Sequence, residues 1–261
     1  MNFEFKEKYN TNDLIEIVRI LRSPDGCPWD KVQTHQSIRK DFIEEVYEAV
    51  DAIDAADSEH LREELGDVLL QVVFHSVLAE EENDFVYEDV VDDICKKMII
   101  RHPHVFGDVN AETTEQVLKN WDAIKMSTHD QTTVAQAMES VSKTMPSLMR
   151  AQKLHKKAGK CSYFKTEQNK MLDQVQSGIE KLRALSDNAD QEEKERLIGE
   201  LLFSVSGLSS SYDVDAEQSL YNACDDFINR FASFEAEAAS QDIKIQELPE
   251  TKAGQLWKNS K

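Results

Sequence analysis

Glycine and proline are rare in this chain: 8 and 5 of its 261 residues, against a combined average near 12 % in globular proteins. Sandwiches and barrels built from many short strands need more turn residues than this. Alanine, glutamate, leucine, lysine and glutamine, which favour helices, fill the sequence instead. With 40 % hydrophobic residues the chain can form a real core. The composition therefore predicts an all-α protein.

The net charge of −20 makes some partners unfavourable. An acidic surface repels nucleic-acid polymers and anionic membranes, but a bound cation can still recruit a small anionic ligand. No apolar run approaches the roughly 18 residues of a membrane span, and the first ten residues lack the apolar region of a secretory signal. The four cysteines are widely spaced, without a C-x-x-C pair, which indicates reduced thiols and a cytoplasmic location.

Apolar residues recur at helical spacing along most of the chain. The pattern predicts helices over 12–22, 35–54, 59–82, 87–102, around Val117 to Ile124, 135–157 with a start at Pro146, 167–186, 190–210 and 215–240, then a polar tail containing Trp257. The polar stretch 126–134 has no periodicity and is interpreted as a linker.

The two halves of the chain are related in pattern. A shift of 133 residues places LGDVLL at 65–70 on IGELLF at 198–203, and a shift of 129 places Arg101 on Arg230. Because the matches occur in the same order, a tandem duplication is the favoured interpretation. We expect an N-terminal domain over 1–127, and a linker and second domain over 128–261.

Acidic residues gather on the second and third predicted helices. Glu44, Glu45 and Glu48 occupy one sector of the former, and Glu64 and Asp67 share a face of the latter. In an antiparallel hairpin, equal residue counts from the turn give equal heights, so Glu48 would meet Glu64 and Glu45 would meet Asp67. Carboxylates so close repel one another unless a cation neutralises them, and hard oxygen ligands suit Mg²⁺ or Mn²⁺.

The alternative interpretation is an ordinary solvated acidic face. Two features favour a site. Glu45 and Glu64 border the apolar stripes of their helices, so partial burial is expected. Gly66 lies inside a strongly apolar helix at a cost of about 1 kcal/mol relative to alanine, which favours a close approach by a helix or ligand there.

Five motifs carry a resemblance to a known family. They are Cys27-Pro28-Trp29-Asp30-Lys31, Glu44-Glu45-x-x-Glu48, Glu64-Leu65-Gly66-Asp67, Arg101-His102-Pro103-His104-Val105-Phe106 and Trp121-x-x-Ile124-Lys125. In this order and spacing they resemble the MazG family of nucleoside triphosphate pyrophosphohydrolases. The segment 145–154 is similar to the start of that family's second domain. The resemblance spans the chain and is strongest up to about residue 158.

The resemblance implies an all-α homodimer with four-helix-bundle cores and tandem MazG-like domains. Such an enzyme cleaves a nucleoside triphosphate between the α and β phosphates, releasing the monophosphate and pyrophosphate. By resemblance, Glu45, Glu48, Glu64 and Asp67 are Mg²⁺ ligands, with Mn²⁺ as an alternative metal. Glu44 is a further ligand or orients the attacking water. Metals bridging carboxylates and phosphates would screen charge in an in-line attack.

Several cationic residues and one tryptophan, in the motifs or near them, are candidates for binding the substrate. Lys31, Lys97, Arg101 and Lys125 can hold phosphate oxygens. For Lys97 and Lys125 a role in surface solubility is an equal alternative. Trp29 either stacks on a base or anchors its loop.

The second half departs from the acidic pattern. The shift of 133 places Ser177, Gly178, Lys181, Leu197 and Glu200 at the positions of the five acids. Leucine and lysine cannot replace Mg²⁺ ligands. We therefore expect a degenerate second domain that supports dimerisation or regulation. Because the second domain can be the catalytic one in this family, the alternative is a weakly active or inactive nucleotide-binding regulator.

Overall fold

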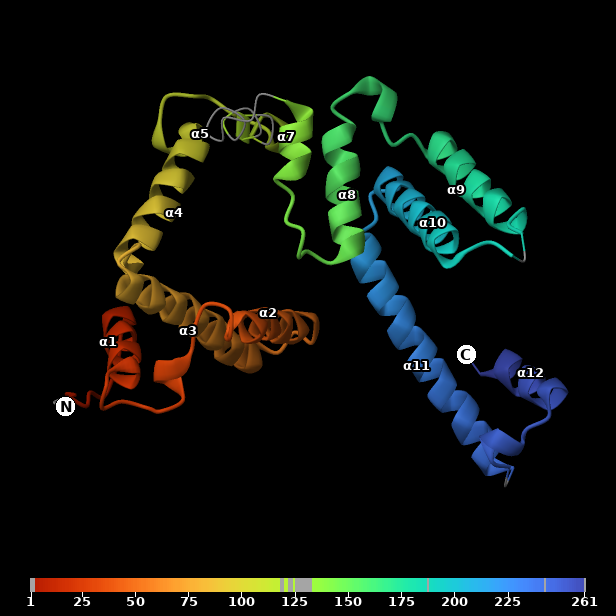
Figure 1. The fold of residues 1–261 in the computed structure, drawn as a ribbon, viewed down its shortest axis with the longest axis horizontal. Coiled ribbons are helices and arrows are strands. Elements are labelled where there is room, and N and C mark those ends of the chain that lie inside the picture. Colours follow the sequence, from red (N-terminus) through yellow and green to blue (C-terminus); the bar gives the residue numbers. More distant parts are fainter. Residues whose placement is uncertain are drawn as a thin grey trace. The chain divides into compact units, whose positions relative to one another are not determined.

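A computed structural model describes residues 3–117, 120–121, 124, 133–186, 188–241 and 243–260. Their regular elements are α-helices and short 3-10 helices, with no strand in these ranges, which confirms the all-α prediction (Figure 1). The chain divides into two compact units, Met1–Lys125 and Met126–Lys261. No helix in the described ranges is long and apolar enough to cross a membrane.

The first unit contains five α-helices and one 3-10 helix whose bounds the structure gives in full, and its predicted helices over the first hundred residues are confirmed. They are α1 (Thr11–Arg22), η1 (Asp30–Val32), α2 (Arg39–Asp54), α3 (Ser58–Glu82), α4 (Tyr87–Arg101) and α5 (Pro103–Phe106). Helix α2 begins four residues later than predicted, because Thr34 and Ser37 bond to each other's backbone amides and form a turn instead of a cap. The predicted helix around Val117–Ile124 lies partly outside the described residues, as does most of the predicted linker.

Side-chain caps fix the helix ends that shape the first unit. Asn10 and Asp13 form a capping box, in which each side chain accepts a hydrogen bond from the other's backbone amide and closes the start of α1. Asp57 accepts from the amides of Glu59 and His60 at 3.1 Å and starts α3. Just before it, Ala56 adopts φ 53° and reverses the chain. The result is the antiparallel hairpin of α2 and α3.

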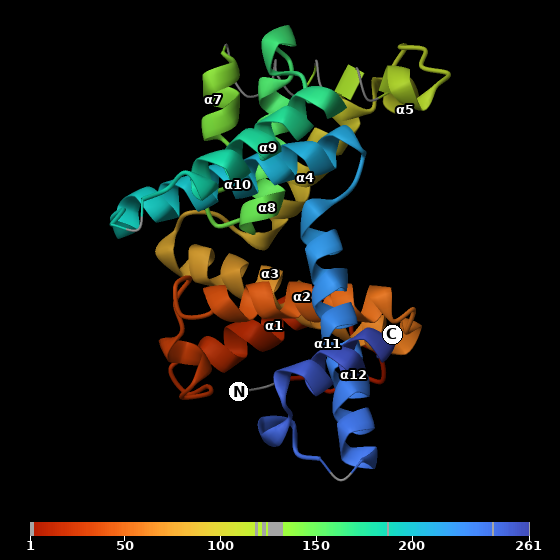
Figure 2. The same ribbon diagram turned by 90° about the vertical axis from the view of Figure 1, so that its right-hand side faces the viewer.

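The core of the first unit lies at the open end of this hairpin. Helices α2 and α3 pack side by side, and α1 packs on α3 (Figures 1 and 2). The buried cluster consists of Ile15, Val18, Ile38, Val73, Phe74, Val77 and Leu78. Its α3 members all belong to the second half of that helix. The first half of α3, which carries the acidic residues, therefore lies beyond the core toward the turn.

The second unit repeats helical hairpin packing. It contains α7 (Val134–Glu139), α8 (Ser147–Ala158), η2 (Ser162–Phe164), α9 (Gln168–Arg183), α10 (Gln191–Ser211), α11 (Ala216–Ser240), η3 (Ile245–Glu247) and α12 (Glu250–Asn259). The predicted stretch 135–157 comprises α7 and α8, and α8 begins directly after Pro146 as predicted. Helices α9 and α10 form a hairpin on which α8 packs.

The predicted polar tail is wrong: residues 250–259 form α12, which packs on α11 (Figure 2). Trp257 lies against Phe234 at 5.8 Å between ring centroids. The guanidinium of Arg230 lies 4.1 Å from the Trp257 ring and donates to the backbone carbonyls of Trp257 and Ser260. Local polarity concealed this helix, because its burial depends on partners in α11.

Candidate metal centre

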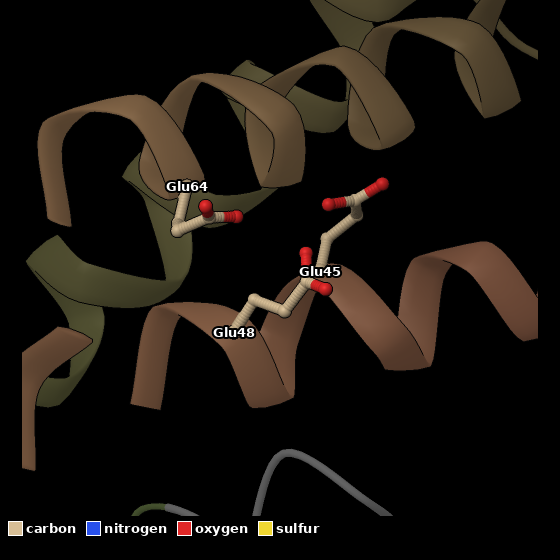
Figure 3. A group of neighbouring side chains, drawn as sticks. All are labelled: Glu45, Glu48 and Glu64. Atoms are coloured by element: carbon tan, nitrogen blue, oxygen red, sulfur yellow. The ribbon is translucent and has the colours of Figure 1, made fainter. Parts of the chain in front are cut away.

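Three carboxylates meet across the α2–α3 hairpin. One oxygen each of Glu45, Glu48 and Glu64 lies within 4.8 Å of the others. Figure 3 shows Glu45 and Glu48 rising from one helix and Glu64 pointing toward them from the other. Glu64 is buried, Glu45 is half-buried and Glu48 is exposed. The group therefore combines one buried carboxylate with one that is open to solvent.

Asp67 and Glu44 border this group. Asp67 is half-buried, and its charge acts on Glu45. Glu44 is exposed, and its Oε2 lies 4.0 Å from Nζ of Lys40 on the same helix. The structure thus groups Glu45, Glu48 and Glu64, places Asp67 beside Glu45, and leaves Glu44 at the rim.

The electrostatics of the group favour a cation. Burial raises the pKa of Glu45, and the charges of Asp67, Glu48, Glu64 and Glu44 raise it further, in that order. A divalent cation among these oxygens would reverse that effect, because it stabilises the ionised form. Carboxylate oxygens are the ligands that Mg²⁺ and Mn²⁺ prefer. The donor set and its mutual repulsion therefore fit such an ion.

His60 is a neighbour of the site that sequence reasoning missed. Its Nε2 lies 2.9 Å from Oε1 of Glu64, one helical turn later. A side chain that hydrogen-bonds to a metal-binding carboxylate commonly fixes the orientation of that carboxylate. The His-x-x-x-Glu spacing at residues 60–64 is the signal that could have identified it, since residues four apart on a helix are neighbours.

Of the two approaches expected at Gly66, the close approach of a helix does not occur within this unit, and a ligand approach stays a prediction. A Cβ at Gly66 would meet no atom within 4 Å among the described residues, so no helix approaches it closely there. Around it the hairpin exposes apolar side chains: Leu65 is 54 % exposed and Val46 is 44 % exposed. This apolar surface continues along α2 to Ile53, which is 57 % exposed.

The predicted substrate-binding residues that the structure describes lie on elements other than the hairpin. Trp29 is 59 % exposed and so does not anchor its loop by burial, and Lys31 donates from Nζ to the Pro24 carbonyl at 3.2 Å. Lys97 and Arg101 lie on α4, which leads away from the hairpin (Figure 1), and the Arg101 guanidinium lies 5.4 Å from the Trp121 ring. Lys125 falls outside the described residues.

Arg22, which sequence reasoning also missed, holds the loop that carries Trp29. Its NH1 donates to the carbonyls of Asp30 and Gln33 at 2.5 and 3.2 Å. Its Nε and NH2 form a fork on both carboxylate oxygens of Glu81 in α3. Only 5 % of the Arg22 side chain is exposed, so the loop is tied to α3 through a buried cation.

The far end of the same loop is fixed by two histidines. Nδ1 of His35 lies 2.7 Å from Nδ1 of His75 on α3, and the rings are stacked. Burial lowers the pKa of His75, and the neighbouring His35 lowers it further. One Nδ1–H of the pair can donate to the other Nδ1, and the lowered pKa of His75 favours the uncharged form of that ring.

Comparison with known proteins identifies the family. The MazG nucleotide pyrophosphohydrolase domain matches residues 33–106, which include all five acids. The chain is 35 % identical to the nucleoside triphosphate pyrophosphohydrolase/pyrophosphatase MazG of Thermotoga maritima, over 95 % of this chain and 94 % of the relative. It is also 35 % identical to the nucleoside triphosphate pyrophosphohydrolase of Escherichia coli K12, over 95 % of each chain. An uncharacterized Bacillus subtilis protein, YabN, is 37 % identical over 94 % of this chain, which spans half of that relative. The chain therefore belongs to the MazG family of nucleotide pyrophosphohydrolases.

Proposed function

We propose that this protein is a Mg²⁺-dependent nucleoside triphosphate pyrophosphohydrolase, which converts an NTP or dNTP and water into the monophosphate and pyrophosphate. The observation that carries the proposal is the meeting of Glu45, Glu48 and Glu64 across the hairpin, inside the segment that matches the family domain. The names of the relatives from Thermotoga maritima and Escherichia coli support the same reaction.

The five acidic residues are proposed to have two roles, metal binding and activation of the attacking water. Glu45, Glu48, Glu64 and Asp67 would hold Mg²⁺, or Mn²⁺ in its place. When bound, the ion would neutralise phosphate charge and make a water more acidic. Glu44, exposed at the rim, would orient the attacking water and accept its proton. The water oxygen bonds to the α-phosphorus, the bond from that phosphorus to the bridging oxygen breaks, and pyrophosphate leaves.

Cations must complete a site that is otherwise acidic. Lys31, Lys97, Arg101 and Lys125 are proposed to hold phosphate oxygens. The exposed indole of Trp29 is proposed to stack on the base. Because α4 leads away from the hairpin (Figure 1), the residues on it would reach the carboxylates of another copy more readily than their own.

We propose a homodimer on this basis. Helix α4 has no buried residue, and it exposes Ile94, Met98 and Ile99 by 41–50 %. The hairpin exposes a second apolar surface around Val46 and Leu65. Contiguous exposed apolar side chains are typical of protein–protein interfaces. Mixing inactive Glu45→Gln protein with inactive Arg101→Ala protein should restore part of the activity if each site uses both copies. A lack of recovery in a confirmed mixed dimer would contradict shared sites.

The second unit is proposed to be a degenerate duplicate of the first. In each unit an α-helix, a 3-10 helix, a helical hairpin and a long helix follow in the same order. Lys181 and Glu200, which replace Glu48 and Asp67, lie 3.7 Å apart, and Arg196 bonds to Glu200 at 2.7 Å. Basic side chains therefore neutralise Glu200 where the first unit would need a metal. We propose that this unit supports dimerisation or regulation.

Product analysis tests the assignment of the reaction to the first unit. Purified protein is incubated with each common NTP and dNTP and Mg²⁺, and pyrophosphate and orthophosphate are measured. Glu45→Gln combined with Asp67→Asn should abolish pyrophosphate release, whereas Glu200→Gln should preserve it. The opposite pattern would place the chemistry in the second unit. Nucleotide binding without either product would favour an inactive regulatory protein.

We also propose that the protein works in the cytoplasm and does not bind nucleic-acid polymers. Its four cysteines carry free thiols, which suits a reducing compartment. The net charge of −20 disfavours polyanions that arrive without metal.

A further inference from the structure

Gln71 is a buried polar residue without a complete set of partners. Its side chain lies in α3 and the residue is 9 % exposed. Its amide oxygen Oε1 is buried and has no hydrogen-bond partner among the described residues. Buried polar atoms are almost always hydrogen-bonded, and an unpaired one lowers stability. The packing of the described residues therefore gives no reason for a polar side chain at this position.

The position of Gln71 relates it to the acidic group. At 100° per residue, Glu64, Asp67 and Gln71 fall within a sector of about 60° on α3. Glu64 in this stripe points across the hairpin to α2 (Figure 3), so the stripe faces that helix. One turn further along, His75 contacts Phe42 of α2 at 5.5 Å between ring centroids. Gln71 thus lies on the inner face of the hairpin, between the carboxylates and the histidine pair.

We infer that Gln71 is a specificity-determining residue that accepts a hydrogen bond from the nucleoside part of the substrate. The inference rests on the proposed function. With the phosphates held at the carboxylates, the sugar and base must extend away from them. A neutral amide adds no charge for phosphate, but its oxygen accepts from a ribose hydroxyl or a base N–H. A few placed polar groups in a largely apolar site set orientation and specificity in this way.

A purely structural role for Gln71 and a role in nucleotide recognition predict different effects of substitution on the melting temperature. If Gln71 stabilised the fold through hydrogen bonds, Gln71→Leu should lower the melting temperature. For a buried oxygen without a partner, an apolar side chain of similar size is neutral or stabilising. When the site binds a ligand through that oxygen, however, the leucine leaves the ligand's donor unpaired. Stability and nucleotide recognition should therefore separate.

Gln152 in the second unit offers a matched control. Its Nε2 donates to the Val214 carbonyl at 2.8 Å and to Ser210 Oγ at 3.2 Å. Its Oε1 accepts from the Ala216 amide at 3.0 Å. Every polar atom of this side chain has a partner within the protein, so Gln152→Leu should lower the melting temperature and leave nucleotide preference unchanged.

The experiment compares wild type, Gln71→Leu and Gln152→Leu in the full chain. Melting temperature, kcat and KM are measured for four NTPs and the four matching dNTPs with Mg²⁺. For Gln71→Leu we expect an unchanged or higher melting temperature. We also expect a fall of about tenfold in kcat/KM for the best substrate, mainly through KM, and smaller ratios between nucleotides. Loss of the ribo/deoxy ratio identifies the sugar hydroxyl as the donor, and loss of the base ratios identifies the base.

Three results would overturn the inference: a lowered melting temperature, unchanged ratios between nucleotides, or an equal loss for every nucleotide. The last would indicate a contact to metal or phosphate. If wild type itself releases no pyrophosphate, the proposed function fails. Stabilisation of wild type and Gln71→Leu by each nucleotide with Mg²⁺ then measures the same ratios without turnover.

Discussion

Two arginines of α1 each form a two-bond ion pair with a glutamate of α3, but one arginine side chain is buried and the other is exposed. Arg22 forms a fork on Glu81 and also binds two loop carbonyls, and its side chain is 5 % exposed. Arg19 forms a fork on Glu80 but is 45 % exposed. Replacing each by alanine therefore separates the effect of a buried loop anchor from that of a surface ion pair.

The expected magnitudes follow from these contacts. Arg22→Ala leaves the Asp30 and Gln33 carbonyls without their charged donor, and such bonds contribute about 1.5–3 kcal/mol. Glu81 is 44 % exposed and regains water, so loss of its ion pair adds about 1 kcal/mol or less. A total near 3 kcal/mol corresponds to a fall of roughly 10 °C in Tm for a domain of this size. Arg19→Ala should cost about 0–1 kcal/mol.

Thermal unfolding followed by circular dichroism measures both variants. The kinetic consequence is also specific: a released loop should raise the KM for nucleotide through Trp29 and Lys31, with a smaller change in kcat. Equal falls in Tm for the two variants, or a destabilised Arg22→Ala protein with an unchanged KM, would refute the reasoning.

Three further predictions follow from other sites. A Cβ at Gly207 would lie 2.8–2.9 Å from His155 and Met171. Crowding of this kind costs about 1–3 kcal/mol and alanine gains about 1 kcal/mol in helix propensity, so Gly207→Ala should lower stability by about 1 kcal/mol. Gly199→Ala on the same helix meets nothing within 4 Å and should stabilise; denaturant titration compares the two. Glu45→Gln should raise Tm without metal, because the raised pKa of Glu45 means that its ionised form opposes folding above that pKa. The same substitution should remove the stabilisation by Mg²⁺. A lower Tm without metal would count against this. Folding lowers the pKa of His75, so its contribution to stability should be fully present above the ordinary histidine pKa near 6.5 and should decline as the pH falls below that value. His75→Gln should flatten this decline in a pH series of melting curves. An unaltered decline would assign it to other groups.

The sequence alone determined most of the helices and the acidic constellation, for a local reason. Apolar residues at helical spacing predict helices whatever surrounds them, and residues three or four apart share a face. Once a hairpin was assumed, counting residues from its turn also showed that Glu48 and Glu64 lie at equal heights along their helices. The element order and the MazG motifs also depend on neighbours in the sequence.

Only the tertiary structure decided which side chains are buried and what they contact. The fork of Arg22, the histidine pair and the unpaired Gln71 oxygen depend on residues 40 or more positions away or on enclosure by several helices. The same applies to α12, whose polar sequence becomes a packed helix through Trp257. Burial is a property of the assembled helices, because the free energy of a charge or an amide depends on the dielectric and partners that distant segments supply. The sequence thus located the carboxylates, and the fold determined how strongly they repel one another and which of their neighbours can meet a ligand.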